Sequence, residues 1–318
     1  MKKQLIATLL MTMTSASFAA PLDTTISMLP STSISFTSPN NVTEKCIIPA
    51  RLVMGQDDNQ NQNDLKEQQA LCALDLYKEP ICPKLYSTNP GILIEKAPDG
   101  MSKADFEKNH CGYNDDFKSV IAKFKQSVTC SYSPSGLAAF EIGRILDIGH
   151  IPQVVLRTMD FKEHQKIRDR AYKLDVKKRM TKYWDSFSSL YGPPKSPLLF
   201  TEDGLIYGHL AKNPKNENSY TEISGVGDYS TRYERFAKQA PFLKASNSTS
   251  LLKQINSDKM LDRISTALQI KEVSDMVLID YLLAQDDRIG NIHYKFKWAV
   301  VENGDLKQTQ DLLADGIA

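Results

Sequence analysis

FKSVIAKFKQSVTCSYSPSGLAAFEIGRILDIGHIPQVVLRTM, residues 117–159, carries the clearest secondary-structure pattern in the chain. Apolar and polar side chains alternate over residues 117–128, which predicts a strand. The apolar and β-branched run at 151–159 predicts a second strand that returns beside the first. A helix is expected between them, so the segment indicates an α+β fold. The first strand should carry Val120, Ala122 and Phe124 on one face and Ile121, Lys123 and Lys125 on the other.

The helix between these strands has a recognisable beginning and end. Ser133 is a favourable N-cap residue, and Pro134 suits the first helical position, where a backbone N–H would have no partner. Gly149 supplies a C-terminal stop. The spacing of the apolar residues predicts one helical face, consisting of Ala138, Ile142, Ile145 and Leu146.

Turn signals and hydrophobic periodicity continue through the C-terminal half of the chain. They predict a hairpin over 198–210 with its turn at Asp203-Gly204, a buried apolar helix over 273–284, an acidic loop over 286–291, a strand over 292–300 followed by a turn at Asn303-Gly304, and a helix over 308–317.

The N-terminus has the pattern of a cleavable secretory signal peptide, residues 1–19. Lys2 and Lys3 form its basic region, and the apolar run at 5–13 is too short to span a bilayer. Small residues precede a cleavage point after Ala19. No later apolar segment is long enough for an anchor, so we expect a secreted or periplasmic protein without a stable membrane anchor.

Residues 20–90 are expected to form a polar leader. Ser, Thr, Asn, Gln and Asp dominate residues 20–65, so this stretch should bury little apolar surface and be mostly irregular. One helix is predicted over 66–78. Residues 91–96, GILIEK, then predict a strand that runs into a turn at Pro98-Asp99-Gly100.

Charge and cysteine content exclude several classes of site. The formal net charge of +1 provides no global basic field for nucleic acid. No CxxC pair is present, and the histidines form neither HxxxH nor HExxH spacing, which argues against a zinc enzyme. An exported chain can form disulfides. The odd cysteine count implies a free thiol, an intermolecular bridge or a missing partner for one of Cys46, Cys72, Cys82, Cys111 and Cys130.

The order of elements suits phosphoryl transfer. This chemistry needs a lysine for nucleotide phosphates, an aspartate that orients the attacking hydroxyl, and an Asn and an acidic group that hold the metal. The chain offers a strand with lysines, then a helix and a strand, and much later an apolar helix that leads into an acidic loop and a hairpin.

The segments FKQ, AAFEIGRILDIGHIPQVVLR and IDYLLAQDDRIGNIHYKF resemble the secretory-pathway protein kinases of the Golgi casein kinase type. They resemble lipid kinases and persister-toxin kinases more distantly. The resemblance covers roughly residues 117–298. It implies a two-lobed protein-kinase-like domain, with an N-lobe at about 91–160 and a partial C-lobe at about 161–318. It also implies that ATP with Mg²⁺ or Mn²⁺ phosphorylates a hydroxyl of a protein or small molecule.

The resemblance assigns roles to five residues. Lys125 follows Phe124 as in the family's Phe-Lys motif and would contact phosphate, with Lys123 in reserve. Asp287, which precedes an arginine, would be the catalytic aspartate, and the spacing to the metal-binding Asn291 leaves Asp286 as an alternative.

Two departures from the family pattern lead to alternative hypotheses. The family's glutamate at the start of the helix is replaced by Gly136, and Glu141 lies further along. The expected metal-binding aspartate has only Asp315 as a candidate, which implies a C-terminally truncated or degenerate kinase. The chain is therefore predicted to be an exported kinase or, alternatively, an inactive pseudokinase or partner-binding module. A third hypothesis is an exported binding or structural domain whose resemblance is coincidental.

Overall fold

The structure is a computed structural model whose contacts divide the chain into two units, Met1–Asn213 and Pro214–Ala318. The predicted signal peptide lies outside the described residues. The residues described are 31–49, 58–85, 89–112, 119–128, 131–146, 148, 151–174, 181–193, 195–214, 218–219, 253, 255–284, 293–294, 298–302 and 305–309.

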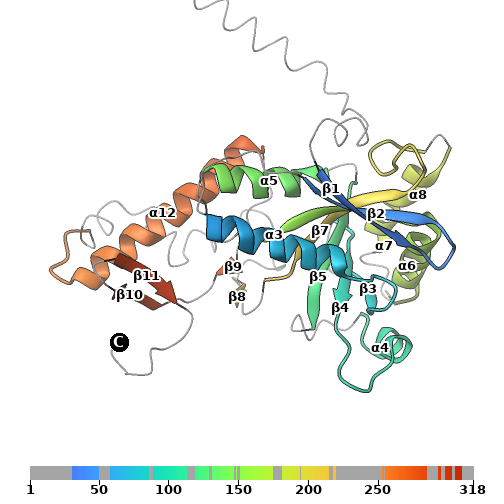
Figure 1. The fold of residues 1–318 in the computed structure, drawn as a ribbon, viewed down its shortest axis with the longest axis horizontal. Coiled ribbons are helices and arrows are strands. Elements are labelled where there is room, and N and C mark those ends of the chain that lie inside the picture. Colours follow the sequence, from blue (N-terminus) through green and yellow to red (C-terminus); the bar gives the residue numbers. More distant parts are fainter. Residues whose placement is uncertain are drawn as a thin grey trace, which may run out of the picture. The chain divides into compact units, whose positions relative to one another are not determined.

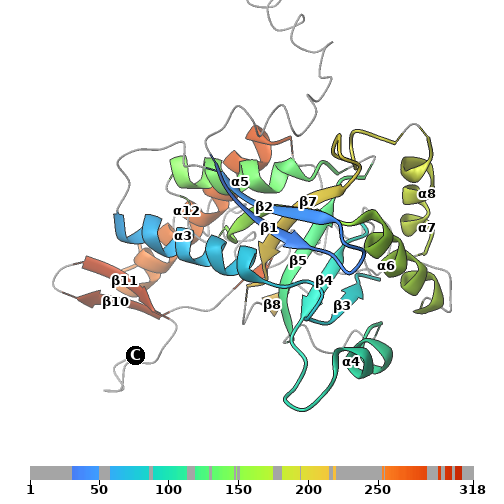
Figure 2. The ribbon, with the colours of Figure 1, turned by 45° about the vertical axis from the view of Figure 1, so that its right-hand side comes forward.

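A seven-stranded antiparallel sheet forms the centre of the first unit (Figure 1, Figure 2). Its strand order is β1-β2-β6-β7-β5-β4-β3, which places strands distant in sequence beside one another. The strands are β1 (Ser31–Thr37), β2 (Thr43–Pro49), β3 (Ile81–Pro83), β4 (Ile92–Glu95), β5 (Val120–Gln126), β6 (Val154–Met159) and β7 (Ile206–Lys212). The α+β class is therefore confirmed, and both strands predicted in residues 117–159 are present.

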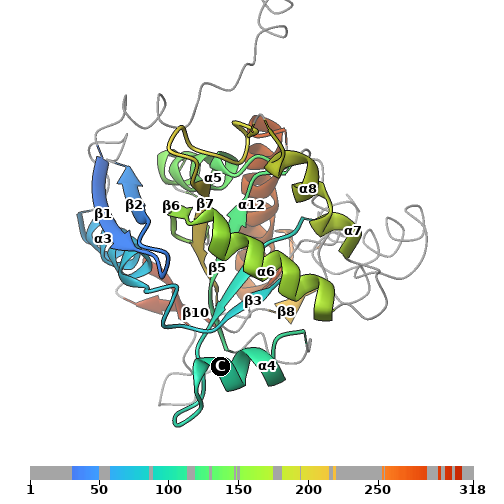
Figure 3. The same ribbon diagram turned by 90° about the vertical axis from the view of Figure 1, so that its right-hand side faces the viewer.

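Helices pack on both faces of this sheet (Figure 3). Side chains from α3 and α6 enter the main hydrophobic core with the inward residues of β2 to β7. On the opposite face, Leu137 of α5 packs against Ile47, Leu156 and Tyr207. The helices described in this unit are α3 (Asp58–Ala73), α4 (Lys103–Asn109), α5 (Pro134–Ile145), α6 (Phe161–Leu174), α7 (Thr181–Trp184) and α8 (Ser186–Tyr191).

The predicted faces of β5 are confirmed. Val120, Ala122 and Phe124 are buried at 3%, 0% and 0% exposure, whereas Lys125 is exposed and Lys123 is half-buried. Burial of such apolar side chains contributes about 25 cal/mol per Å² removed from water. The apolar face therefore fixes which side of β5 the lysines occupy.

The predicted irregular leader is wrong for residues 31–49. This segment forms β1 and β2, which pair along their full length, and β2 joins the sheet through β6. Polar composition hides the strand period, because β1 lies at the sheet edge with its polar side chains exposed. The helix predicted at 66–78 instead spans Asp58–Ala73, and so begins within the polar run.

A buried charge network also ties this N-terminal hairpin to the core. Glu44 accepts hydrogen bonds from the Tyr77 hydroxyl and, at 2.6 Å, from the backbone N–H of Asp160. Its other oxygen lies 3.6 Å from the guanidinium of Arg157, which stacks 3.8 Å from the ring centroid of Phe36. Burial raises the pKa of Glu44, against the lowering effects of these partners. Residues 31–49 are thus an integral part of the domain.

The helical face predicted for α5 is also wrong. Ile145 and Leu146 are 51% and 39% exposed, whereas Phe140, Glu141 and Gly143 are buried. A Cβ added at Gly143 would lie 2.1 Å from Cδ1 of Ile151, so this glycine allows the close approach that sets the buried face. The spacing of apolar residues in the sequence does not reveal such a contact.

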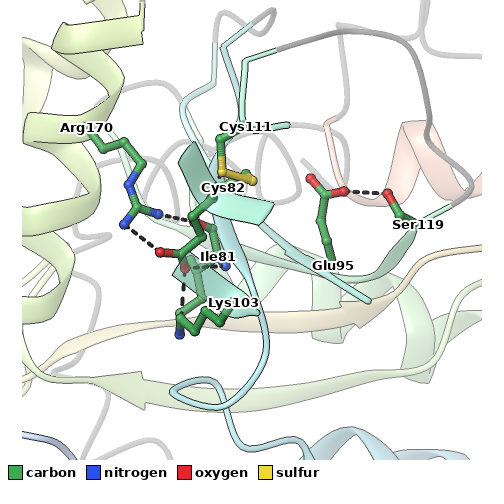
Figure 4. The surroundings of a disulfide bond; sticks show 8 residues. Ile81, Cys82, Glu95, Lys103, Cys111, Ser119 and Arg170 are labelled. Carbon is green, nitrogen blue, oxygen red and sulfur yellow. Dashed lines mark hydrogen bonds and ion pairs between the residues drawn. A yellow bond between two sulfur atoms is a disulfide. The ribbon is translucent and has the colours of Figure 1, made fainter. Parts of the chain in front are cut away.

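Two disulfides cross-link the first unit. Cys46–Cys72 joins β2 to α3, and Cys82–Cys111 joins β3 to the segment after α4. Beside the second disulfide, Arg170 donates to the carbonyl of Ile81 at 2.6 Å (Figure 4) and to Glu107 at 2.7 Å. Disulfides persist in oxidising compartments, in agreement with the expected export. Cys130 lies outside the described residues.

The Asp203-Gly204 turn is confirmed. Gly204 has φ +78°, and the backbone N–H of Thr201 donates to the carbonyl of Leu205 at 2.9 Å. The expected hairpin is short, however, because Phe200 and Ile206 form only an isolated bridge. Strand β7 instead pairs with β5 and β6.

In the second unit, α12 (Met260–Leu282) confirms the predicted apolar helix but begins earlier. It is not generally buried: Ile279 is 7% exposed, while Tyr281 is 85% exposed. Within the described ranges, no helix is long and apolar enough to cross a bilayer. The remaining elements are the pairs β8 (Asn218–Ser219) with β9 (His293–Tyr294), and β10 (Trp298–Glu302) with β11 (Asp305–Thr309).

The β10–β11 pair confirms the predicted hairpin, because Glu302 and Asp305 are partners on either side of Asn303-Gly304. The single strand predicted over 292–300 is instead divided between β9 and β10. The helix expected from residue 308 is wrong at 308–309, which belong to β11.

We predict that removing the Cys46–Cys72 disulfide lowers the free energy of unfolding by about 3 kcal/mol, because the bridge closes a loop in the unfolded chain. The two cysteines are 26 residues apart. Urea unfolding of Cys46→Ser, Cys72→Ser and the double variant, all in a Cys130→Ser background, measures the effect. The double variant should lose about as much as either single one. Additive losses would show that the two side chains act independently.

Candidate functional site

The lysine-bearing face of β5 is the strongest candidate site in the described chain. Strand β5 lies between β4 and β7, so residues on this face have neighbours on both sides. Lys123 pairs with Leu93 of β4 and Ala211 of β7, and Lys125 pairs with His209 of β7. The structure therefore brings together the two lysines that the sequence singled out.

A third lysine, which sequence reasoning missed, lies on the same side. The backbone N–H of Lys84 donates to the carbonyl of Gly91 at 2.8 Å, continuing the β3–β4 ladder. Gly91 precedes Ile92, whose partner is Phe124, so the register places Gly91 beside Lys125. A Cβ added at Gly91 would lie 3.8 Å from Cγ of Lys125. We name Lys84, Lys123 and Lys125 the lysine cluster.

The lysine cluster concentrates positive charge. Burial lowers the pKa of Lys84 to about 7, and repulsion from Lys125 and Lys123 adds to the effect. The Lys125 side chain is partly exposed to solvent. Burial of the rest among its neighbours lowers its pKa as well. Among the described residues, no carboxylate forms an ion pair with Lys84 or Lys125. An anionic ligand would therefore stabilise the charged form of these amines.

Ser133 connects this face to the start of α5. Its hydroxyl donates a hydrogen bond to the carbonyl of Lys125 at 2.7 Å and accepts one from the backbone N–H of His209 at 2.8 Å. The Nδ1 atom of His209 lies 2.7 Å from the carbonyl of Ser133, which fixes the imidazole. Ser133 is the predicted N-cap residue, but its side chain bonds to the strands instead of capping the helix.

The imidazole of His209 occupies the space beside Gly136. A Cβ at Gly136 would lie 2.7 Å from Cε1 of His209 and 2.8 Å from Nδ1. Burial lowers the pKa of His209 to about 4, and the nearby Lys125 contributes to the shift, so the ring is neutral at pH 7. The position at which the resembled family has a glutamate is thus covered by a neutral ring. Glu141 is buried further along α5.

The predicted catalytic and metal residues lie outside the part of the chain that is described: Asp286, Asp287, Asn291 and Asp315. Their relation to Lys125 stays a prediction. Within the described segments, no group of three or more His, Cys, Asp or Glu side chains could hold a metal ion.

Two functional candidates, Lys84 and His209, had weak sequence signals. Lys84 follows a short strand in a loop-like context, and its place beside β5 depends on strand order. His209 lies in the hairpin predicted over 198–210, but its contact with Gly136 comes from two elements distant in sequence.

No family model, curated protein or solved structure matches the chain. The structure establishes an α+β domain with a seven-stranded antiparallel sheet and interleaved helices. The kinase resemblance of the sequence therefore stays a hypothesis about this domain.

We predict opposite effects of Gly136→Ala in two backgrounds. In the wild-type protein the added methyl group meets a fixed imidazole, and overpacking should lower the free energy of unfolding by about 1–3 kcal/mol. In a His209→Ala background the methyl has room, and the better helix propensity of alanine should stabilise by up to about 1 kcal/mol. Chemical denaturation of the four proteins measures this cycle. The same sign in both backgrounds would contradict the packing described.

We also predict that Lys84 acylates unusually fast near neutral pH. Only the neutral amine is nucleophilic, and the lowered pKa of about 7 makes that form abundant between pH 7 and 8. Its acylation rate, followed by peptide mass spectrometry, should level off above about pH 8 in the folded protein. The control is the urea-unfolded chain, where the Lys84 rate should keep rising towards pH 10. Identical profiles in both states would refute the shift.

Proposed function

We propose that this protein is an exported kinase-like protein that binds a nucleoside triphosphate, with Lys125 in contact with its phosphates. One observation carries this proposal. Lys125 stands on a central strand, turned away from the hydrophobic core, and no carboxylate within the described ranges neutralises it by an ion pair. A lysine held on a rigid strand is a typical phosphate-binding group in phosphotransferases.

In this proposal, transfer of the γ-phosphoryl group to a protein or small-molecule hydroxyl depends on residues of the second unit. Asp287, or Asp286, would orient the hydroxyl, and Asn291 would hold the Mg²⁺ or Mn²⁺ of the nucleotide. Lys123 lies two residues from Lys125 on the same face and would add charge near the phosphates. The two disulfides support export, because such bonds are rare in reducing compartments.

A second candidate function is a catalytically inactive exported module that binds nucleotide or a partner. The contact between Gly136 and His209 favours it. In kinases an acidic side chain holds the phosphate-binding lysine in place by an ion pair. Here a neutral imidazole is Lys125's neighbour on β7, and it cannot supply that charge.

Two variants separate binding from transfer. Lys125→Met should weaken ATP binding at least tenfold, because a charged hydrogen bond contributes about 1.5–3 kcal/mol. Asp287→Ala should leave binding nearly unchanged and abolish transfer. Calorimetry with ATP and Mg²⁺ or Mn²⁺ measures binding, and transfer from labelled ATP to protein and small-molecule hydroxyls measures activity.

The matched control is Lys45→Met, which removes the same charge from exposed Lys45 of β2. If Lys125→Met reduces ATP binding but the wild-type protein transfers no phosphoryl group, the inactive module is the correct candidate. ATP binding that responds equally to Lys125→Met and Lys45→Met would refute nucleotide binding at Lys125 in both candidates.

A further inference from the structure

We propose that the lysine cluster is one binding site for a multiply charged phosphate chain, with Gly91 leaving the position between Lys84 and Lys125 open. This inference deepens the proposed function and rests on it for the location of the site, but it does not require phosphoryl transfer. It assigns a role to Lys84 and Gly91, which the kinase resemblance does not include.

The backbone register supports the site. Lys84, Gly91 and Lys125 occupy neighbouring positions on three adjacent chain segments, because Lys84 bonds to Gly91 and Gly91 lies beside Lys125. Adjacent strands are about 4.8 Å apart, so the backbones of Lys84 and Lys125 are separated by about twice that distance. Any larger residue at position 91 would place its side chain between the two lysines. Glycine leaves both amines free to approach one ligand.

The charge distribution points to a ligand with several negative charges. Repulsion from Lys125 and Lys123 acts on Lys84, so the three positive charges act on the same region of this face. A single orthophosphate cannot compensate this cluster as fully as a chain of phosphates, whose oxygens extend from one lysine to the next. Charge-assisted bonds to phosphate are the strong class of hydrogen bond. We therefore expect tripolyphosphate to bind more tightly than pyrophosphate, and pyrophosphate more tightly than orthophosphate.

Proton uptake provides a readout that a merely structural lysine would not give. The pKa of Lys84 is about 7, and the charged groups that act on it are Lys123 and Lys125 of β5. A bound anion favours the ammonium form, so binding at pH 7.5 should draw a proton from the buffer. Over pH 7 to 9, the affinity of the wild-type protein should accordingly fall relative to that of Lys84→Met for the same anion.

The experiment is calorimetry with inorganic tripolyphosphate, pyrophosphate and orthophosphate, in two buffers that differ in ionisation enthalpy. We expect Lys84→Met to weaken tripolyphosphate binding about tenfold and to reduce the proton uptake. Gly91→Val should weaken it similarly, since its side chain would stand beside Lys125. Lys45→Met, the charge-matched control, should change affinity less than twofold. Circular dichroism and melting temperature verify that each variant is folded.

The outcomes separate this inference from the proposed function. If Lys84→Met binds tripolyphosphate like the wild-type protein, the inference is overturned, whereas loss of ATP binding in Lys125→Met would still support the proposed function. If tripolyphosphate binds as expected but ATP does not, the site serves an inorganic phosphate chain and the nucleotide proposal fails. If Gly91→Val is unfolded, Lys84→Met decides alone. Equal affinity for all three anions would also overturn the inference.

Discussion

The hydroxyl of Ser133 lies between two backbone groups of neighbouring strands, the carbonyl of Lys125 and the N–H of His209. This contact ties the start of α5 to β5 and β7. It also positions the His209 ring beside Gly136 and next to Lys125. The candidate site thus lies where a side-chain hydroxyl bridges two paired strands. A buried hydroxyl with both partners satisfied is stable there, because each of its hydrogen bonds offsets the loss of water.

The fold gives Lys125 and Lys84 different surroundings. The side chain of Lys125 is exposed, whereas its backbone is fixed by pairing in the sheet and by the hydrogen bond from Ser133. Lys84 is more enclosed, and the neighbouring positive charges make its protonation unfavourable. The lysine cluster therefore combines an exposed lysine with a more enclosed one, and burial lowers the pKa of both. Such a combination is a feature of ligand sites more often than of structural surfaces.

Features that depend on a local period could be predicted from the sequence. Val120, Ala122 and Phe124 alternate, and they are buried on one face of β5. Features that depend on contacts between distant segments could not be predicted. The buried face of α5 follows from Gly143 against Ile151, and the place of β1 and β2 follows from pairing with β6 and from Glu44. His209 and Lys84 escaped notice for the same reason, since only the strand order brings them to Lys125. The lysines of β5 could be identified because they occupy one strand.

The position of β2 has a consequence for how the chain acquires its fold. The sheet reaches β2 through β6, and the bond from Lys45 to Thr158 spans 113 residues, whereas the Cys46–Cys72 bridge spans 26. Contacts of long sequence separation form late, because closing a long loop costs entropy before any pairing offsets it. The N-terminal hairpin is synthesised long before its partner strand β6. The local bridge can link it to α3 in the meantime, so oxidation would precede completion of the sheet and protect an unpaired strand edge from other chains.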